Sequence, residues 1–443
     1  MTKYGSLTPT KISSVARYNK LGAYSIFIFV VFLFLLSTLF DPADRALGLK
    51  LPLYVACWGI GLLIHMGRQG PIKISIGLLI YTFLMTLIPI TSVGYYLVTD
   101  GSEPFEGFLL LKSYLFISFA ILIYFTRINA MKYLSIALTI LAIQILLLTA
   151  VVLIYPETHI PLYTFGEDYG IFSIDSGRDY GSGFKWFQMY FVTSSMLVIP
   201  IAYYFDLAKS SKQNIGFYWA LVLLSICAMF IAGTRNNMIM AIVLPATLFV
   251  VYSKHRLDTI ILMAAAIGLF IFTWRVEIAT FFDPTEASNN VKLSMLEDYA
   301  VIFSDSNNLL FGRGLGSYEC WTGRGYNFVT ELTYLEIIRN FGLLLGGLMI
   351  LLLLYPIAYA FLISRSYKKK NIVLAYAAYL IMSISNPLLF SSMGMLILGI
   401  IIADIFIHDT DMRRRRLSQR ISIRSAASSQ AFAIPNKGFK ALH

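Results

Sequence analysis

Charged side chains are scarce in this sequence: Asp, Glu, Lys and Arg together make up 13% of the 443 residues. A soluble domain carries about a quarter, because it needs polar surface to cover its core. Hydrophobic residues instead make up 58%, and the mean hydropathy is +0.71. The composition excludes the two or three soluble domains that the length alone would suggest and predicts an integral membrane protein.

Cysteines and metal-ligand patterns are also nearly absent. Of three cysteines, Cys57 and Cys227 fall in apolar runs and Cys320 in a polar stretch. These positions indicate neither a disulfide framework nor a zinc site. The first apolar run is long and lacks a small-residue cleavage site, so we expect it to remain as a membrane span and not to be removed as a signal peptide.

Apolar runs of spanning length recur along the chain. A span needs roughly 20 apolar residues, and the runs are continuous rather than alternating, which argues against a barrel. We predict an all-α polytopic fold with about twelve transmembrane helices. The predicted spans are Leu21–Phe40, Leu51–Met66, Ile74–Val98, Phe108–Phe125, Tyr133–Tyr155, Trp186–Phe205, Ile215–Ala232, Met238–Tyr252, Leu257–Trp274, Phe341–Ile363, Ile372–Ile384 and Met393–Ile407.

Lys and Arg accumulate in every second connection, the pattern of cytoplasmic loops. With an even number of spans, both termini are expected in the cytoplasm: residues 1–20, then a transmembrane domain over 21–412, then a basic, Ser-rich tail over 413–443. We expect this tail to be disordered and to rest on anionic lipid. The net charge of +11 is thereby a topology signal, and no nucleic-acid partner is predicted. The basic connections contain Lys3, Lys11, Arg17, Lys20, Arg68, Lys73, Arg127, Lys132, Lys209, Lys212, Lys254, Arg256, Arg365, Lys368, Lys369 and Lys370.

Two predicted external loops, near 156–185 and 275–330, are much longer than the others, and loops of this length are uncommon unless they are functional. The first is rich in aromatic residues, which stack on sugar rings or anchor a loop at the membrane interface. The second contains a predicted helix at Val291–Phe303 and then Gly312, Gly314 and Gly316. No strand or βαβ unit precedes these glycines, so we interpret them as a turn that returns the chain to the membrane and not as a dinucleotide loop.

Several cations lie at predicted membrane ends. Arg235 sits in Gly233–Asn237 between two apolar runs with almost no loop; it either snorkels to the headgroups or forms an anion site, since guanidinium suits phosphate. Arg178 is either a loop charge paired with Asp179 or part of such a site, and Lys112 is expected to snorkel outward. Arg313 and Arg324 flank the return of the second loop and are either solvated or functional.

The stretch Glu331–Gly342 is predicted to open the tenth span as a helix, because Leu332, Leu335, Ile338 and Phe341 follow helical spacing. Glu336 and Arg339 are three residues apart and are predicted to pair on one face. Glu331 is turned about 140° from Glu336 at 3.6 residues per turn. It is either a plain acid at a helix N-terminus or a base directed into an external cavity.

Three segments resemble the O-antigen ligase and polymerase superfamily of bacterial envelopes. Phe311–Tyr318 resembles the family's loop signature of small residues, Glu331–Leu335 resembles the start of the following helix, and Gly233–Arg235 resembles a short Gly-Ser-Arg turn between spans. Ligases typically place a His-Asn pair where this chain has Glu331 and Leu332. The departure favours a polymerase, which can use an acid there.

The resemblance implies a GT-C-like membrane glycosyltransferase of the bacterial inner membrane. Such an enzyme joins undecaprenyl-pyrophosphate-linked repeat units, and its expected partners are the lipid-linked donor and acceptor, the bilayer and a chain-length regulator. By this resemblance Arg235 and Arg178 would bind the pyrophosphate and Glu331 would activate the acceptor hydroxyl, with no metal or other cofactor required. The expected substrate-binding residues are Arg313, Tyr318, Arg324, Tyr334 and Arg339.

Other functions remain open at this point. The runner-up enzyme is the ligase, which transfers glycan to the lipid A core. A flippase for lipid-linked oligosaccharides also uses about twelve spans, but it should show internal repeats and charges along a central cavity, which this sequence does not display. A purely structural membrane protein would leave Arg235 unexplained.

Overall fold

The computed structural model describes residues 12–67, 74–99, 104–179, 185–273, 275, 279, 283, 287–364, 366–387 and 389–432. Its helices are α1 (Ile12–Phe40), α2 (Lys50–Met66), α3 (Ile76–Thr99), α4 (Pro104–Leu115), α5 (Phe119–Thr126), α6 (Ala130–Ile154), α7 (His159–Tyr169), α8 (Val198–Ser210), α9 (Ile215–Ile231), α10 (Arg235–Tyr252), α11 (Arg256–Thr273), α13 (Ala287–Ser304), α14 (Ser306–Phe311), α15 (Thr333–Ala358), α16 (Lys370–Met382) and α17 (Ser392–Phe432). Its strands are β1 (Phe172–Asp179), β2 (Lys185–Phe191), β3 (Glu319–Trp321) and β4 (Gly325–Asn327).

The architecture is that of a helical, multi-pass membrane protein. Within the described residues, eight helical segments are long and apolar enough to cross a membrane, and three shorter apolar helices, α2, α9 and α16, accompany them. Many large apolar side chains on these helices face outward, as lipid contact requires, while others pack into one continuous core. The count of about twelve spans, and the side of the membrane that each end faces, stay predictions.

The predicted span Trp186–Phe205 is wrong. Its first part is strand β2, which pairs antiparallel with β1 from Phe172↔Phe191 to Asp179↔Lys185. The helix that follows, α8, has 13 residues, fewer than the 17–25 of a typical span. The run misled because a short continuous apolar stretch has no period that separates strand from helix. Its aromatic residues favour a strand once a partner strand is available.

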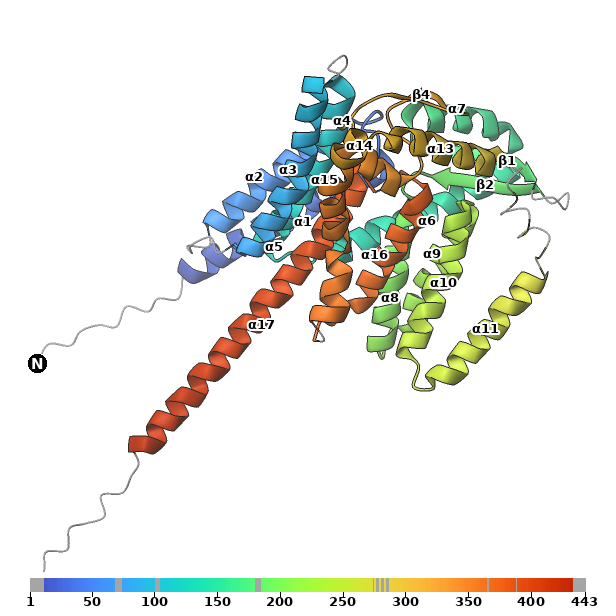
Figure 1. The fold of residues 1–443 in the computed structure, drawn as a ribbon. Helices are drawn as coiled ribbons and strands as arrows, with labels where there is room; N and C mark the ends of the chain where they lie inside the picture. The colour runs from blue at the N-terminus through green and yellow to red at the C-terminus, as the bar shows by residue number, and fades with distance from the viewer. Residues whose placement is uncertain are drawn as a thin grey trace, which may run out of the picture.

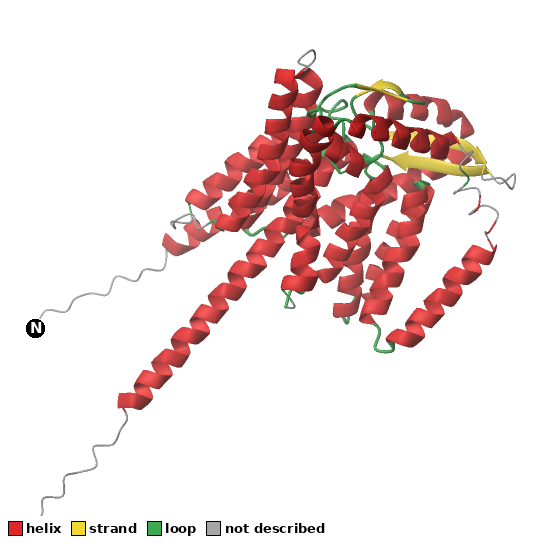
Figure 2. Cartoon of the chain, in the orientation of Figure 1, coloured by secondary structure: helices red, strands yellow, loops and turns green. Residues whose placement is uncertain are grey.

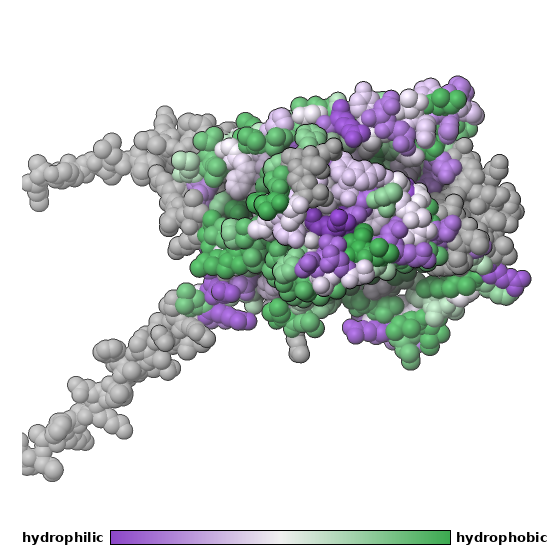
Figure 3. Space-filling view, turned by 45° about the horizontal axis from the view of Figure 1, so that its top comes forward, coloured by the Kyte–Doolittle hydropathy of each residue, from purple (hydrophilic) through white to green (hydrophobic). Residues whose placement is uncertain are grey.

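Two hairpins and three helices form a layer at one end of the helix bundle (Figure 1). This loop layer consists of α7, β1, β2, α13, α14, β3 and β4. In the described part of the chain, the strands occur only here (Figure 2). The predicted helix at Val291–Phe303 is confirmed as part of α13. Viewed with this end forward, hydrophilic residues gather over the layer, whereas hydrophobic ones line the flank of the bundle (Figure 3).

The C-terminal tail departs from its prediction. Helix α17 continues through Arg413–Arg416 to Phe432 and projects away from the bundle (Figure 1). The prediction of disorder is therefore wrong for residues 413–432. The physical reason is that this stretch contains neither Gly nor Pro, so an existing helix can propagate until it approaches Pro435. Residues 433–443 lie outside the described residues.

Candidate functional site

The glycine segment 312–316 returns the chain to the bundle by close backbone packing. Gly312, Gly314 and Gly316 all have positive φ, between 77° and 96°. A Cβ at Gly312 would lie 2.5 Å from the backbone nitrogen of Gly342, and one at Gly316 would lie 2.5 Å from that of Gly107. The interpretation of these glycines as a tight turn is confirmed, because they let the loop lie directly on α4 and α15.

Helix α15 is kinked where this turn crosses it. Gly342 has φ 68° and ψ 174°, which is outside the helical region, and a Cβ there would lie 2.2 Å from the Leu310 carbonyl oxygen. The Ser92 hydroxyl of α3 ties the two segments together: it donates to the Asn340 carbonyl at 2.6 Å and accepts from the Leu315 N–H at 2.9 Å. The first part of α15, Thr333–Phe341, is thereby held under the loop layer.

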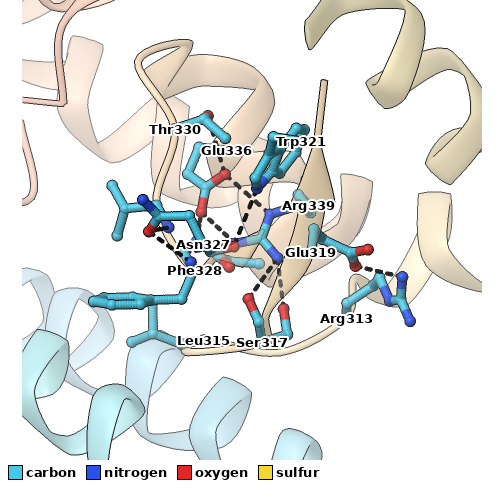
Figure 4. Close-up of polar contacts among 12 residues, drawn as sticks. Arg313, Leu315, Ser317, Glu319, Trp321, Asn327, Phe328, Thr330, Glu336 and Arg339 are labelled. Atoms are coloured by element: carbon cyan, nitrogen blue, oxygen red, sulfur yellow. Dashed lines mark hydrogen bonds and ion pairs between the residues drawn. The ribbon is translucent and has the colours of Figure 1, made fainter. Parts of the chain in front are cut away.

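The predicted pairing of Glu336 with Arg339 is confirmed, and the pair is buried (Figure 4). The side chain of Arg339 is 0% exposed and that of Glu336 is 3% exposed. A guanidinium has five N–H donors, and in Arg339 each makes a hydrogen bond: two go to Glu336 at 2.5 and 3.0 Å, two to Ser317 and one to the Phe328 carbonyl. No donor of Arg339 is left for a ligand. Arg339 therefore holds the segment that contains Ser317 and Phe328 against α15.

Aromatic and hydroxyl groups complete the surroundings of this pair. Tyr299 donates to Glu336 Oε2 at 2.8 Å, and the Trp321 ring lies 5.7 Å from the Arg339 guanidinium carbon. Burial, and then the Glu336 carboxylate, raise the pKa of Tyr299 well above its ordinary value, so the phenol remains a neutral donor. We call Glu336, Arg339 and the groups bonded to them the buried pair.

A second set of charges surrounds one turn of α13. The Arg235 guanidinium donates to Asn289 Oδ1 at 2.5 Å, and the Lys292 ammonium lies 3.5 Å from the Glu331 carboxylate, which also pairs with Arg324. Asn289 and Lys292 are three residues apart on α13, so they are neighbours on its surface. The structure therefore brings Arg235 and Glu331 against the same face of one helix. We call Arg235, Lys292, Arg324 and Glu331 the α13 charge cluster.

This cluster is only partly covered by protein. The exposed fractions of the side chains are 28% for Lys292, 25% for Glu331 and 49% for Arg324, and Arg235 is half-buried. Three of its members are cations and one is an anion. Nearby, burial and then the Glu331 carboxylate raise the pKa of Tyr190 to about 12. Water and ligands can reach such groups, so the cluster is suited to an anion in a way that the buried pair is not.

The turn before Arg235 is fixed on several sides. Gly233 has φ 69° and lies against the side chain of Gln188 on β2, and the Thr234 hydroxyl caps α10 by accepting from the Asn237 N–H at 3.2 Å. Asn236 donates to the Ser385 hydroxyl at 2.7 Å. Arg235 is the first residue of α10, where the free backbone N–H groups and the helix dipole also favour an anion.

The other predicted site residues lie between the end of α14 and the start of α15. Glu331 was predicted to stand at the start of this helix; it lies two residues before α15, which begins at Thr333. Arg313 pairs with Glu319. Tyr318 stacks on Tyr326 with ring centroids 4.9 Å apart, and the Tyr334 hydroxyl donates to the Leu380 carbonyl.

Arg178 and Lys112 are the remaining cations for which the sequence predicted a role. The backbone of Arg178 lies in β1, opposite Trp186 in β2, and its side chain lies outside the described residues. Lys112 pairs with Asp44 at 3.0 Å. Lys292 and Asn289, which organise the charge cluster, carried no signal in the sequence, because their helix gives no indication of which loop residues pack on it.

A comparison with protein-family models, curated proteins and solved structures found no match to the chain. Over the residues that the structure describes, no group of three or more His, Cys, Asp and Glu side chains is placed to hold a metal ion.

Proposed function

We propose that the protein is a polysaccharide polymerase that joins undecaprenyl-pyrophosphate-linked repeat units at the outer face of a bacterial inner membrane. One observation carries the proposal: Arg235 and Glu331, which are distant in sequence, both contact the same turn of α13, through Asn289 and Lys292, and Arg324 pairs with Glu331. The cluster combines cations with a single carboxylate and is partly exposed at one end of a membrane bundle. Transfer of a glycan from a lipid pyrophosphate uses both kinds of group: cations for the leaving group and a base for the acceptor hydroxyl.

The chemistry assigns each group one task. The acceptor hydroxyl oxygen attacks the anomeric carbon of the donor glycan, the bond from that carbon to the pyrophosphate oxygen breaks, and undecaprenyl pyrophosphate leaves with the electron pair. Arg235, Arg324 and Lys292 stabilise the negative charge that develops on this leaving group. Glu331 accepts the hydroxyl proton. Arg178, whose side chain lies outside the described residues, stays a candidate for a further phosphate contact.

The ion pairs of Glu331 fit this task. Arg324 pairs with one carboxylate oxygen of Glu331 and Lys292 with the other. Arginine and lysine are also the usual phosphate ligands. A pyrophosphate that binds Arg324 and Lys292 draws them from Glu331, which frees its carboxylate oxygens to accept a hydrogen bond from the acceptor hydroxyl.

The test is an assay with purified protein and lipid-linked repeat units. Wild-type protein is expected to form a ladder of long glycans, and Arg235→Ala and Glu331→Ala are expected to abolish it while both variants insert normally. Arg127→Ala is the matched control, because Arg127 pairs with Asp411 outside the cluster. Transfer to lipid A core instead of a ladder would indicate a ligase, neither product would indicate transport, and normal ladders in both variants would refute the proposal.

A further inference from the structure

A cavity of about 220 Å³ lies beside the buried pair, between α4, the first part of α15 and the segment before α17. It is partly open, and its wall includes Tyr114, Glu336, Asn340 and Phe390. Thr330 and Thr333 also line it, while Glu331 between them turns to the α13 charge cluster. The cavity and the cluster therefore lie on two sides of the same short segment of chain.

Two of the lining residues each have a buried polar atom that lacks a hydrogen-bond partner among the described residues. The Tyr114 hydroxyl and Asn340 Oδ1 are buried and have no hydrogen-bond partner among the described residues, and the two side chains belong to residues 0% and 2% exposed. The amide nitrogen of Asn340 donates to Glu336 at 3.0 Å, which leaves Oδ1 as an acceptor. Buried polar groups are nearly always hydrogen-bonded. Both atoms belong to residues that line the cavity, so a ligand with hydroxyl groups can supply the missing partners after a small shift of these side chains.

The wall also indicates that the ligand is neutral. Glu336 is the only charged side chain among the lining residues that the structure describes, and protein donors occupy both of its carboxylate oxygens. Among the described lining residues, no cation is present to receive a phosphate. Leu315 and Phe390 are apolar residues of the wall, and Ser113 and Tyr114 are hydroxyl-bearing ones. A sugar ring has the same two characters, with apolar C–H faces and a rim of hydroxyls.

The volume limits the size of the ligand. A cavity of 220 Å³ holds about seven water molecules at ~30 Å³ each and is smaller than the ~300–1,000 Å³ of pockets for drug-sized ligands. One sugar ring fits this space, whereas an oligosaccharide repeat does not. We propose that the cavity binds a single neutral sugar ring of a lipid-linked glycan. The choice of a glycan as the source of this ring rests on the proposed function.

Saturation-transfer NMR on the full-length protein in detergent tests this assignment. The probes are methyl glycosides of glucose, galactose, mannose, rhamnose and N-acetylglucosamine, together with lipid-linked repeats extracted from the source cells. We expect at least one probe to bind wild-type protein. Tyr114→Phe removes only the hydroxyl and should weaken this binding about five- to tenfold, the worth of one net hydrogen bond. Ser113→Trp, which fills the cavity, should abolish the signal.

Tyr376→Phe is the matched control, because it removes a buried tyrosine hydroxyl that donates to the Leu353 carbonyl elsewhere in the bundle. It should leave sugar binding unchanged. If no probe binds, or if binding is the same in wild type, Tyr114→Phe and Ser113→Trp, the assignment is overturned even where glycan ladders form. If sugar binding depends on Tyr114 but no ladder forms and inorganic pyrophosphate does not bind through Arg235, the sugar site stands and the proposed polymerase falls.

Discussion

The buried pair and the α13 charge cluster contain the same kinds of side chain in opposite surroundings. Arg339 is fully buried, and all its donors are used within the protein. Arg324 is half exposed and has Glu331 as its acid partner. A buried ion pair with saturated donors can hold a loop but cannot take up a ligand. A partly exposed cluster with excess positive charge gains most when an anion arrives. Substitutions should therefore separate stability from activity between the two regions.

The largest effect is expected on stability, from Arg339→Met in the buried pair. Glu336 would lose its buried cationic partner, and removal of one partner of a buried pair costs about 3–5 kcal/mol. The thermal midpoint of the purified protein in detergent measures this loss. The double variant Glu336→Gln with Arg339→Met should lose less than Arg339→Met alone, because no unpaired charge remains. If Arg339→Met lost activity but kept its thermal midpoint, Arg339 would act on substrate. The contrast between a structural buried pair and a functional α13 charge cluster would then be wrong.

The next largest effect is expected on activity, from Glu331→Gln in the charge cluster. Glutamine keeps the shape of the side chain but cannot accept a proton, so the rate of glycan transfer should fall by about 100-fold or more. Stability should change by less than about 1 kcal/mol, because a partly exposed ion pair contributes little. The rate in the lipid-linked repeat assay and the thermal midpoint together measure this split.

Glu297→Gln is the matched control for Glu331→Gln. Glu297 is exposed on the same helix that carries Lys292, and its neutralisation changes the local net charge equally. Its rate should equal that of wild type. Equal losses in both variants would show that the cluster acts through its overall charge alone, and Glu331 would then not be the base.

A smaller effect on stability is expected from Gly342→Ala, which tests how the buried pair is supported. Alanine would have to adopt a φ of 68° and would place its Cβ against the Leu310 carbonyl; strain of this kind costs about 1–3 kcal/mol. Gly347→Ala in the same helix meets open space and has a helical φ, so it should be neutral or slightly stabilising. If both variants had the same thermal midpoint, the kink would not be what supports the pair.

Residue spacing predicted what depends on local geometry. Apolar runs predicted most of the helices, and the three-residue spacing of Glu336 and Arg339 predicted their pairing, because neighbours on one helix are set by its period. The β1–β2 hairpin was missed, since an apolar run does not reveal a partner strand. The contacts of Lys292 and the buried Tyr114 hydroxyl that lacks a hydrogen-bond partner were also missed. Both depend on which distant segments meet, and a single sequence carries no measure of that.

The smallest effect is expected from Lys292→Gln, and salt makes it measurable. Lys292 contributes one partly exposed ion pair, so the free energy of unfolding should stay within about 1 kcal/mol of that of wild type. Inorganic pyrophosphate should bind severalfold more weakly to the variant at low salt, and this difference should shrink near 0.5 M salt, because exposed charges are screened. Lys254→Gln, an exposed lysine between α10 and α11 at their far end from the loop layer, should show no such difference. Equal pyrophosphate binding by wild type and Lys292→Gln at low salt would show that Lys292 is not part of the anion site, which Arg235 and Arg324 would then form. A loss of pyrophosphate binding that does not depend on salt would indicate that Lys292 makes a contact shielded from solvent, like those of the buried pair.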